Sequence, residues 1–300
     1  MRHVPVLLSE TIEALKLKSG MHVIDCTLGD AGHAEAILEA TAPNGKLLGV
    51  DADPEAILRA KQFLYRFGDR VVFVRDNFSG LGESVSRLAF GPVHGIIMDL
   101  GWSSPQFEER GRGFSFQKDE PLDMRYGGGE STTAADVVNV TREDELERIF
   151  REYGEEKLSK EIARAMIEKR RIAPIIRTVQ LVEVILETYK KKLQSKKDVP
   201  WVGGLHPATK VFQALRIAVN NEYGVLEKAL PQAINVLAPS GRLAVITFHS
   251  GEDRIVKHFF KHQEHKTIRM VYKKPIVCVK EEYEANPRAR SAKLRVVEKL

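Results

Sequence analysis

The sequence predicts an α/β protein with a mostly parallel sheet, and the alternation within its first hundred residues is the main reason. Four short apolar runs end in polar residues, and stretches with apolar residues at helical spacing separate them. A fifth apolar run follows near residue 240, after a long helical region. Strands that alternate with helices at this pitch are typical of βαβ units, in which the strands run parallel.

Each element has an expected place along the chain. Strands are predicted over 22–27, 46–53, 70–77, 94–101 and 240–250, with two more at a sheet edge within 266–276 and 292–300. Helices are predicted within 34–40, 53–67, 142–154, 158–171 and 210–237. Asp53 and Pro54 suit the N-cap and first turn of the second of these helices.

The strand signals stop from about Arg110 to His206. A turn-rich stretch is followed there by helical patterns, and α/β alternation resumes afterwards. We therefore expect one α/β domain, made of residues 1–109 and 207–300, and an all-helical insertion over 110–206 with a role in substrate recognition.

Composition indicates a globular chain in a reducing compartment. Hydrophobic residues make up 43% and charged residues 29%, which is ordinary for a soluble protein. No apolar run approaches the roughly 20 residues that span a bilayer. With only Cys26 and Cys278, neither a disulfide framework nor a four-cysteine zinc site can form, and no metal site is predicted. We expect a cytoplasmic protein.

Basic residues gather in two parts of the chain. The net charge is +5 and the pI about 9.0. Twelve Lys or Arg stand against four Glu between residues 157 and 197, and four basic residues with no acid lie within 286–295. Either run alone is compatible with a solvated helix face or tail. Together they favour a nucleic-acid partner.

The loop after the first strand, Gly29-Asp30-Ala31-Gly32-His33, narrows the class of ligand. It lacks the G-x-G-x-x-G spacing of a dinucleotide site and the Lys of a P-loop. Asp30 would repel a pyrophosphate. It would not repel S-adenosylmethionine, which is cationic at its sulfonium and ammonium groups and has no phosphate.

Acidic and aromatic residues at the ends of the next strands suit the same cofactor. Asp51 ends the second strand, where an acid accepts hydrogen bonds from both ribose hydroxyls. Asp76, Asn77 and Phe78 follow the third strand, and an apolar ring there can cover the adenine. Asp99 ends the fourth strand, where the methyl group and its acceptor should meet. Any one of these residues alone could be an ordinary turn residue.

Several motifs together resemble the MraW family of bacterial methyltransferases. They are HVPVLLSE, DCTLGDAGH, DADPEAI, DLGWSSPQFEERGRGFSF, EPLDMRY, HPATKVFQALRIAVNNE, FHSGEDRIVKHFF and NPRARSAKLRVVEK. The resemblance runs from His3 to near the C-terminus. It implies a Rossmann-like class I methyltransferase fold, the cofactor S-adenosylmethionine, and methylation of N4 of a cytosine in small-subunit (16S) ribosomal RNA.

By the same resemblance, the cofactor contacts fall on seven residues. They are Ala31, Gly32, His33, Asp51, Phe78, Asp99 and Gln106. The chain departs from the family pattern at Asp30 and Ala31, where G-x-G-G-H is more usual, and at Trp102, where a small aliphatic residue is usual. Ala31 makes a positive φ less comfortable in the loop. Trp102 could stack on a base or pack under the insertion.

Two residues are candidates for the chemistry. Asp99 is assigned either to accepting a hydrogen bond from the cytosine amine or to binding the cofactor's ammonium group, and the sequence does not separate the two. His249, after the fifth strand, is a second candidate, and a purely structural His fits equally well. A target cytosine must lie outside any stack, so the RNA is expected to be single-stranded or opened within a partly assembled subunit.

RNA phosphates are expected to contact the insertion and the C-terminal segment, with Arg288, Arg290 and Lys293 as the leading residues. Three other interpretations remain open. The chain could be a non-catalytic RNA-binding assembly factor with a retained cofactor fold, or a methyltransferase for a small molecule or protein; a dinucleotide-dependent dehydrogenase fits least well. The oligomeric state, monomer or homodimer, is open.

Overall fold

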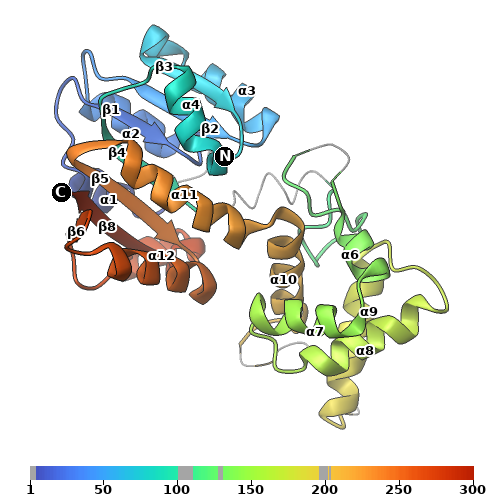
Figure 1. Ribbon diagram of the computed structural model, residues 1–300. Helices are drawn as coiled ribbons and strands as arrows, with labels where there is room; N and C mark the ends of the chain where they lie inside the picture. Colours follow the sequence, from blue (N-terminus) through green and yellow to red (C-terminus); the bar gives the residue numbers. More distant parts are fainter. Residues whose placement is uncertain (1–4, 101–110, 128–130, 196–201, 203) are drawn as a thin grey trace. The chain divides into compact units, whose positions relative to one another are not determined.

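The structure is a computed structural model that describes residues 5–100, 111–127, 131–195, 202 and 204–300, and the chain divides into two compact units (Figure 1). The first unit comprises residues 1–103 and 223–300, and the second comprises residues 104–222. The second unit extends beyond the expected residue 206, because the helix over Ala208–Asn220 packs on other helices of that unit.

The first unit contains an eight-stranded sheet with the order β3-β2-β1-β4-β5-β8-β6, and β7 pairs with β8 outside this path. The strands are β1 His22–Asp25, β2 Leu47–Asp51, β3 Val71–Arg75, β4 Val93–Asp99, β5 Leu237–Thr247, β6 Ile268–Met270, β7 Ile276–Val277 and β8 Lys293–Lys299. Strands β1 to β5 are parallel to their neighbours in this group. The predicted α/β class with a mostly parallel sheet is therefore confirmed.

The C-terminal strands differ from the prediction in their position. The segment over 292–300 was expected at a sheet edge, but β8 lies inside the sheet, antiparallel to β5 on one side and to β6 and β7 on the other. The sequence did not reveal this position, because the order of strands in a sheet depends on pairing between segments that are distant in the chain.

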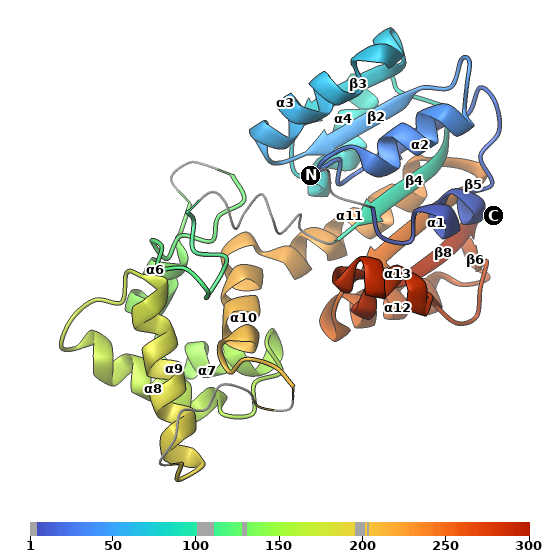
Figure 2. The same cartoon turned by 180° about the vertical axis from the view of Figure 1, so that it is seen from behind.

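Helices cover both faces of the sheet (Figures 1 and 2). The helices of this part are α1 Leu8–Leu15, α2 Gly32–Ala40, α3 Pro54–Phe63, α4 Leu81–Arg87, α11 Glu222–Val236, α12 Ser250–Gln263 and α13 Lys280–Ala285, with 3₁₀ turns η1 Tyr65–Arg70, η2 Phe78–Gly80 and η3 Pro287–Ser291. Helix α3 begins as predicted: the Asp53 carboxylate accepts hydrogen bonds from the backbone N–H groups of Glu55 and Ala56, both at 3.1 Å.

Neighbouring residues of each strand point to opposite faces of the sheet. Val23 packs with α2 and α3, whereas Ile24 packs with α4, α11 and α12. Leu243 and Ala244 divide in the same way, the second facing α1 and the C-terminal segment. This period of two explains why the strands read as continuous apolar runs: both of their faces are buried.

The second unit is built from helices within the residues that the structure describes. They are α6 Ala134–Val140, α7 Glu143–Glu152, α8 Ser159–Arg170, α9 Thr178–Lys192 and α10 Ala208–Asn220. The stretch over 210–237 is helical as predicted, but it forms two helices, because Asn221 adopts φ +48° and separates α10 from α11. Asn tolerates this left-handed conformation better than most residues. No helix in the described part of the chain is long and apolar enough to cross a bilayer.

Candidate functional site

The strand order reverses between β1 and β4, which makes their carboxyl ends the topological switch point of the sheet. Strands β2 and β3 lie on one side of this point and β5 lies on the other. Asp25 pairs in register with Ile97 near the end of β4, and Asp51 pairs with Arg75 at the end of β3. Ligands of open α/β sheets bind outside the carboxyl ends of the strands at such a point. The predicted residues Asp51 and Asp99 both end strands at this edge.

Asp51 holds the glycine loop in place. One carboxylate oxygen accepts a hydrogen bond from the Gly29 N–H at 2.9 Å, and the other accepts from the Asp53 N–H at 2.8 Å. Burial raises the pKa of Asp51, and the hydrogen bonds from these two N–H groups lower it by a smaller amount. The carboxylate therefore shapes the loop besides offering its remaining lone pairs to a ligand, a role that was not predicted from the sequence.

Asp25 and Thr27 join the two strands at the switch point. Asp25 is 2% exposed, and its Oδ1 accepts a hydrogen bond from the Thr27 N–H at 3.0 Å. Desolvation, with a smaller contribution from the charge of Asp51, raises the pKa of Asp25 to about 7. The Thr27 hydroxyl accepts from the Asp99 N–H at 2.7 Å. Neither Asp25 nor Thr27 was singled out from the sequence, although a polar pair directly after a buried strand was a usable signal.

The glycine loop owes its shape to two left-handed residues and one close contact. Gly29 has φ +50° and Ala31, the N-cap of α2, has φ +61°. Gly32 is needed for packing, because a Cβ at this position would overlap the Pro5 ring. Ala31 therefore occupies a conformation that favours glycine.

Replacing Ala31 with Gly is expected to raise the free energy of unfolding by up to about 1.5 kcal/mol. The substitution removes the strain of the left-handed conformation, which stabilises the folded state by about 1–2 kcal/mol. It also makes the unfolded chain more flexible, which destabilises the folded state by about 0.5–1 kcal/mol. Urea denaturation measures the difference. Ala31→Ser, which keeps the Cβ, serves as the control and should show no gain; a loss of stability in Ala31→Gly would contradict the strain.

The charge of Asp30 is balanced inside the protein. Its carboxylate lies 3.1 Å from Nε of Arg59, whose guanidinium also approaches Asp53 at 3.8 Å. A carboxylate that is paired with a guanidinium presents little net charge to a ligand. Asp30 would therefore repel a pyrophosphate only weakly, in contrast to the expectation from the sequence. The missing glycine spacing and the missing P-loop lysine still argue against a phosphate site.

His33 lies between the N-terminal segment and Asp99. Its side chain is almost fully buried, its Nε2 lies 3.1 Å from the Val6 carbonyl oxygen, and its Nδ1 lies 3.7 Å from Asp99 Oδ2. Because a carbonyl only accepts, Nε2 carries the proton of this hydrogen bond. The structure thus brings together three of the predicted cofactor residues, Gly32, His33 and Asp99, around the first turn of α2.

The residues after β3 form a capped turn at the same edge. Asn77 Oδ1 accepts a hydrogen bond from the Ser79 N–H at 2.9 Å and starts η2. Asp76 accepts from the Asn77 N–H at 2.7 Å and from the Ser84 hydroxyl at 3.3 Å. Phe78 is half-buried and packs against the core beneath it. The assignment of Phe78 to the adenine stays a prediction.

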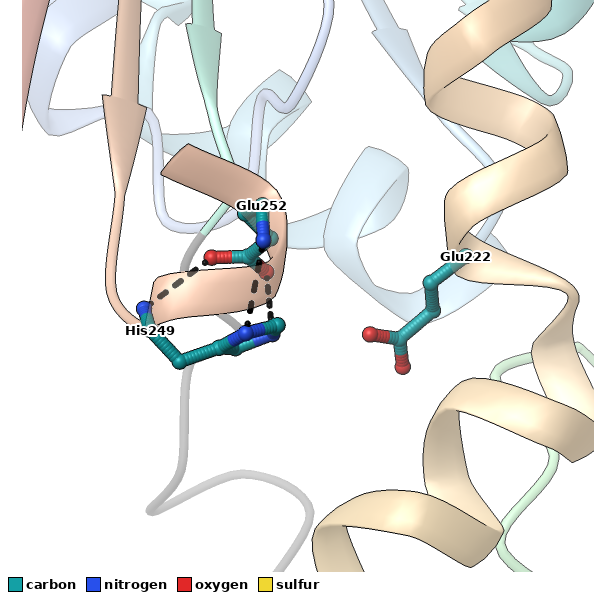
Figure 3. Close-up of side chains that lie close together, drawn as sticks. All are labelled: Glu222, His249 and Glu252. Atoms are coloured by element: carbon teal, nitrogen blue, oxygen red, sulfur yellow. Dashed lines mark hydrogen bonds and ion pairs between the residues drawn. The ribbon is translucent and has the colours of Figure 1, made fainter. Parts of the chain in front are cut away.

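His249 is the N-cap of α12 (Figure 3). Its Nδ1 accepts a hydrogen bond from the Glu252 N–H at 3.4 Å, and the Glu252 carboxylate accepts in return from the His249 N–H at 3.4 Å and also from the Phe248 N–H at 2.8 Å. This reciprocal capping box gives His249 a structural role. Its Nε2 lies 3.1 Å from Glu252 Oε1 without hydrogen-bond alignment, so this nitrogen has no hydrogen bond to a described residue. The catalytic assignment of His249 stays a prediction.

Glu222, also drawn in Figure 3, is bound by residues of the second unit. Its carboxylate accepts hydrogen bonds from the Arg216 guanidinium at 2.9 and 3.0 Å and from the Tyr126 hydroxyl at 2.7 Å. These contacts hold the C-terminal end of α10 to the turn-rich segment before α6.

The C-terminal basic segment is a 3₁₀ turn, η3, followed by β8. Arg290 is exposed on η3, whereas Lys293 Nζ lies 3.2 Å from Asp253 Oδ2 and Arg295 Nε lies 2.7 Å from Asp253 Oδ1. The side chain of Arg288 lies outside the described residues, as do Gln106 and Trp102.

Comparison with known proteins gives consistent matches along the whole chain. A model described as the MraW methylase family matches residues 1–300. Three relatives bear the name "Ribosomal RNA small subunit methyltransferase H". The relative from Carboxydothermus hydrogenoformans is 46% identical, with 99% of this chain and 98% of the relative covered. The one from Symbiobacterium thermophilum is 45% identical, with 99% and 96% covered. The one from Heliobacterium modesticaldum is 43% identical, with 99% and 98% covered.

Proposed function

Because the chain belongs to the MraW methylase family, we propose that it transfers a methyl group from S-adenosylmethionine to the exocyclic N4 nitrogen of a cytosine in small-subunit ribosomal RNA. The observation that carries this proposal is similarity along the whole chain to relatives named as ribosomal RNA small subunit methyltransferases. The chain is accordingly a methyltransferase.

The switch point of the sheet has the donors and acceptors that this cofactor requires. The Asp51 carboxylate would accept hydrogen bonds from the ribose hydroxyls, Phe78 would cover the adenine, and the backbone of the loop over 29–33 would meet the amino-acid end. Asp51 and Asp99 make this edge acidic, which favours a cationic ligand. S-adenosylmethionine supplies a methyl group bonded to a sulfonium, and the remaining chemistry belongs to the protein and the RNA.

The protein's contribution to the reaction is orientation and a hydrogen-bond acceptor. The amine of cytosine is a weak nucleophile because its lone pair is delocalised into the ring, so alignment supplies much of the rate. Asp99 is our candidate for accepting a hydrogen bond from this amine and then the proton that the nitrogen loses as it gains the methyl group, with S-adenosylhomocysteine as the leaving group. The Thr27 hydroxyl fixes the Asp99 backbone at 2.7 Å, and a fixed acceptor needs no reorganisation during the reaction.

We assign substrate recognition to the helical unit and the C-terminal segment. The exposed side of α8 carries Lys160 and Arg164 at helical spacing, and the exposed Arg171 follows as the C-cap of this helix, which suits contacts to RNA phosphates. Other basic residues of this unit have internal partners: Arg170 donates to the Val138 and Thr141 carbonyls, both at 2.7 Å.

Methyl transfer to defined RNA tests the proposal. Small subunits that lack the modification would be incubated with the protein and S-adenosylmethionine labelled in its methyl group, and the labelled nucleoside would be identified by mass spectrometry. We expect label on N4 of one cytosine, with no incorporation into subunits that are already modified. Label on another atom would refute the N4 assignment. Saturable RNA binding without any transfer would instead support the non-catalytic assembly factor.

Replacing Arg288 and Arg290 together with Ala is expected to weaken RNA binding and flatten its salt dependence. Removing one phosphate interaction should lower the log–log slope by roughly 0.7 for single-stranded RNA. The affinity for S-adenosylmethionine should stay unchanged, because that site is formed by the strand ends. Filter binding at several salt concentrations measures the slope.

The control for this variant is Arg295→Ala on the adjacent strand. Arg295 and Lys293 both contact Asp253, so we assign them to holding β8 on α12 and not to RNA. Arg295→Ala should lower the melting temperature and keep the salt slope. If the double variant behaved in the same way, Arg288 and Arg290 would be structural.

A further inference from the structure

Residues 5–7, which we call the N-terminal strap, lie directly on the glycine loop of the cofactor site. The Pro5 ring occupies the space that a Cβ on Gly32 would need. The Val6 carbonyl lies 3.1 Å from His33 Nε2. Val6 and Leu7 are 1% and 0% exposed. The strap therefore sets the position of the loop from outside the sheet.

The strap ends in a strained residue. Leu7 has φ +53° and ψ +37°, a left-handed conformation that is unfavourable for a side chain with a Cβ. Its carbonyl accepts the first hydrogen bond of α1, from the Thr11 N–H at 2.9 Å. A non-glycine residue keeps such a conformation only where its surroundings enforce it.

A carboxylate near the C-terminus helps to hold Leu7 in this conformation. Glu282, in the first turn of α13, accepts a hydrogen bond from the Leu7 N–H at 2.7 Å, across 275 residues of sequence. A charged acceptor makes this bond stronger than a neutral one, and a negative charge is favourable at the N-terminus of α1. Val6 and Leu7 also pack in one core cluster with Ala289 and Ala292, which follow α13.

We propose that Glu282 is a positioning residue for the cofactor site: its carboxylate fixes Leu7, and the strap in turn holds the glycine loop and His33 for S-adenosylmethionine. This inference rests on the proposed function, because it assigns the loop to that cofactor. Glu282 acts on the loop through the three successive backbone residues of the strap.

Three variants test this role. Glu282→Ala removes the acceptor, Glu282→Gln keeps an acceptor oxygen at the same length, and Glu281→Ala removes an exposed acid from the same turn as a matched control. Hydrogen exchange of the Leu7 amide reports on the strap. Calorimetry with S-adenosylmethionine and steady-state kinetics report on the site.

In Glu282→Ala we expect faster exchange of the Leu7 amide and about tenfold weaker cofactor binding, as for the removal of a charged hydrogen bond. The KM for S-adenosylmethionine should rise by a similar factor, while the KM for RNA stays unchanged. Glu282→Gln should recover most of the affinity, and Glu281→Ala should match the wild type.

Two results would overturn the proposal. One is wild-type cofactor affinity in Glu282→Ala despite faster exchange at Leu7, which would show that the strap does not position the site. The other is an equal decrease of affinity in Glu282→Ala and Glu282→Gln together with a large fall in melting temperature, which would show general destabilisation. Failure of the wild-type protein to bind S-adenosylmethionine would instead refute the proposed function, and hydrogen exchange would still report on the strap.

Discussion

Replacing Asp51 with Ala is expected to weaken the binding of S-adenosylmethionine by roughly 10- to 100-fold while the sheet stays folded. The loss of a charged hydrogen-bond acceptor costs about 1.5–3 kcal/mol, and each 1.4 kcal/mol is a factor of about ten in affinity. The structure adds a second cause, because the same carboxylate holds the Gly29 N–H at 2.9 Å. Titration calorimetry measures the change.

Asp53 provides the matched control for this variant. It is a carboxylate two residues away that caps α3 through the N–H groups of Glu55 and Ala56. Asp53→Ala should lower the free energy of unfolding by about 1 kcal/mol, as for the loss of an N-cap, and change cofactor affinity little. Wild-type affinity in Asp51→Ala would remove Asp51 from the ribose site.

Replacing Asp25 with Asn is expected to stabilise the protein at pH 8 by up to about 4 kcal/mol and to have much less effect near pH 4. The pKa of Asp25 is about 7 in the folded protein, against an ordinary value of 3.8 for this side chain. A raised pKa means that the ionised form destabilises the fold, and one pKa unit corresponds to about 1.36 kcal/mol. The stability that protonated Asp25 contributes is therefore present below pH 4 and is lost as the pH rises to 7.

Asparagine suits this test because its Oδ1 can still accept the hydrogen bond from Thr27. The new amide group adds a buried donor, which reduces the gain below its upper limit. Urea denaturation from pH 4 to pH 8 measures the difference between variant and wild type. Asp69→Asn, at an exposed position in η1, serves as the control for the same substitution without burial. If the difference in free energy of unfolding between Asp25→Asn and the wild type did not change with pH, the raised pKa of Asp25 would be contradicted.

The main elements of the α/β unit could be predicted from the sequence because their signals are local. Strands β1 to β5 are buried on both faces and appear as short apolar runs, and Asp53 with Pro54 marks the start of α3. The acids at the strand ends could be placed at one edge for the same reason, since parallel strands bring their carboxyl ends together. Asp51 and Asp99 were found in this way.

Features that depend on distant partners could not be predicted. Asp30 appeared to be a free charge, but Arg59 of α3 pairs with it. Lys293 was grouped with the RNA-binding arginines, but Asp253 of α12 is its neighbour. In both cases the residue type was clear and the partner was not, because side chains far apart in sequence leave no local pattern.

The sequence by itself determined the fold class, the acidic edge of the sheet and, through its motifs, the family. Apolar periodicity and residue type carry that information within short windows. Only the tertiary structure decided that β8 lies inside the sheet, that Asp25 is buried beside Asp51, and that Glu282 fixes Leu7 on the strap. These depend on which surfaces meet when the chain is compact, because burial sets the pKa of a carboxyl group and close packing sets the path of a loop.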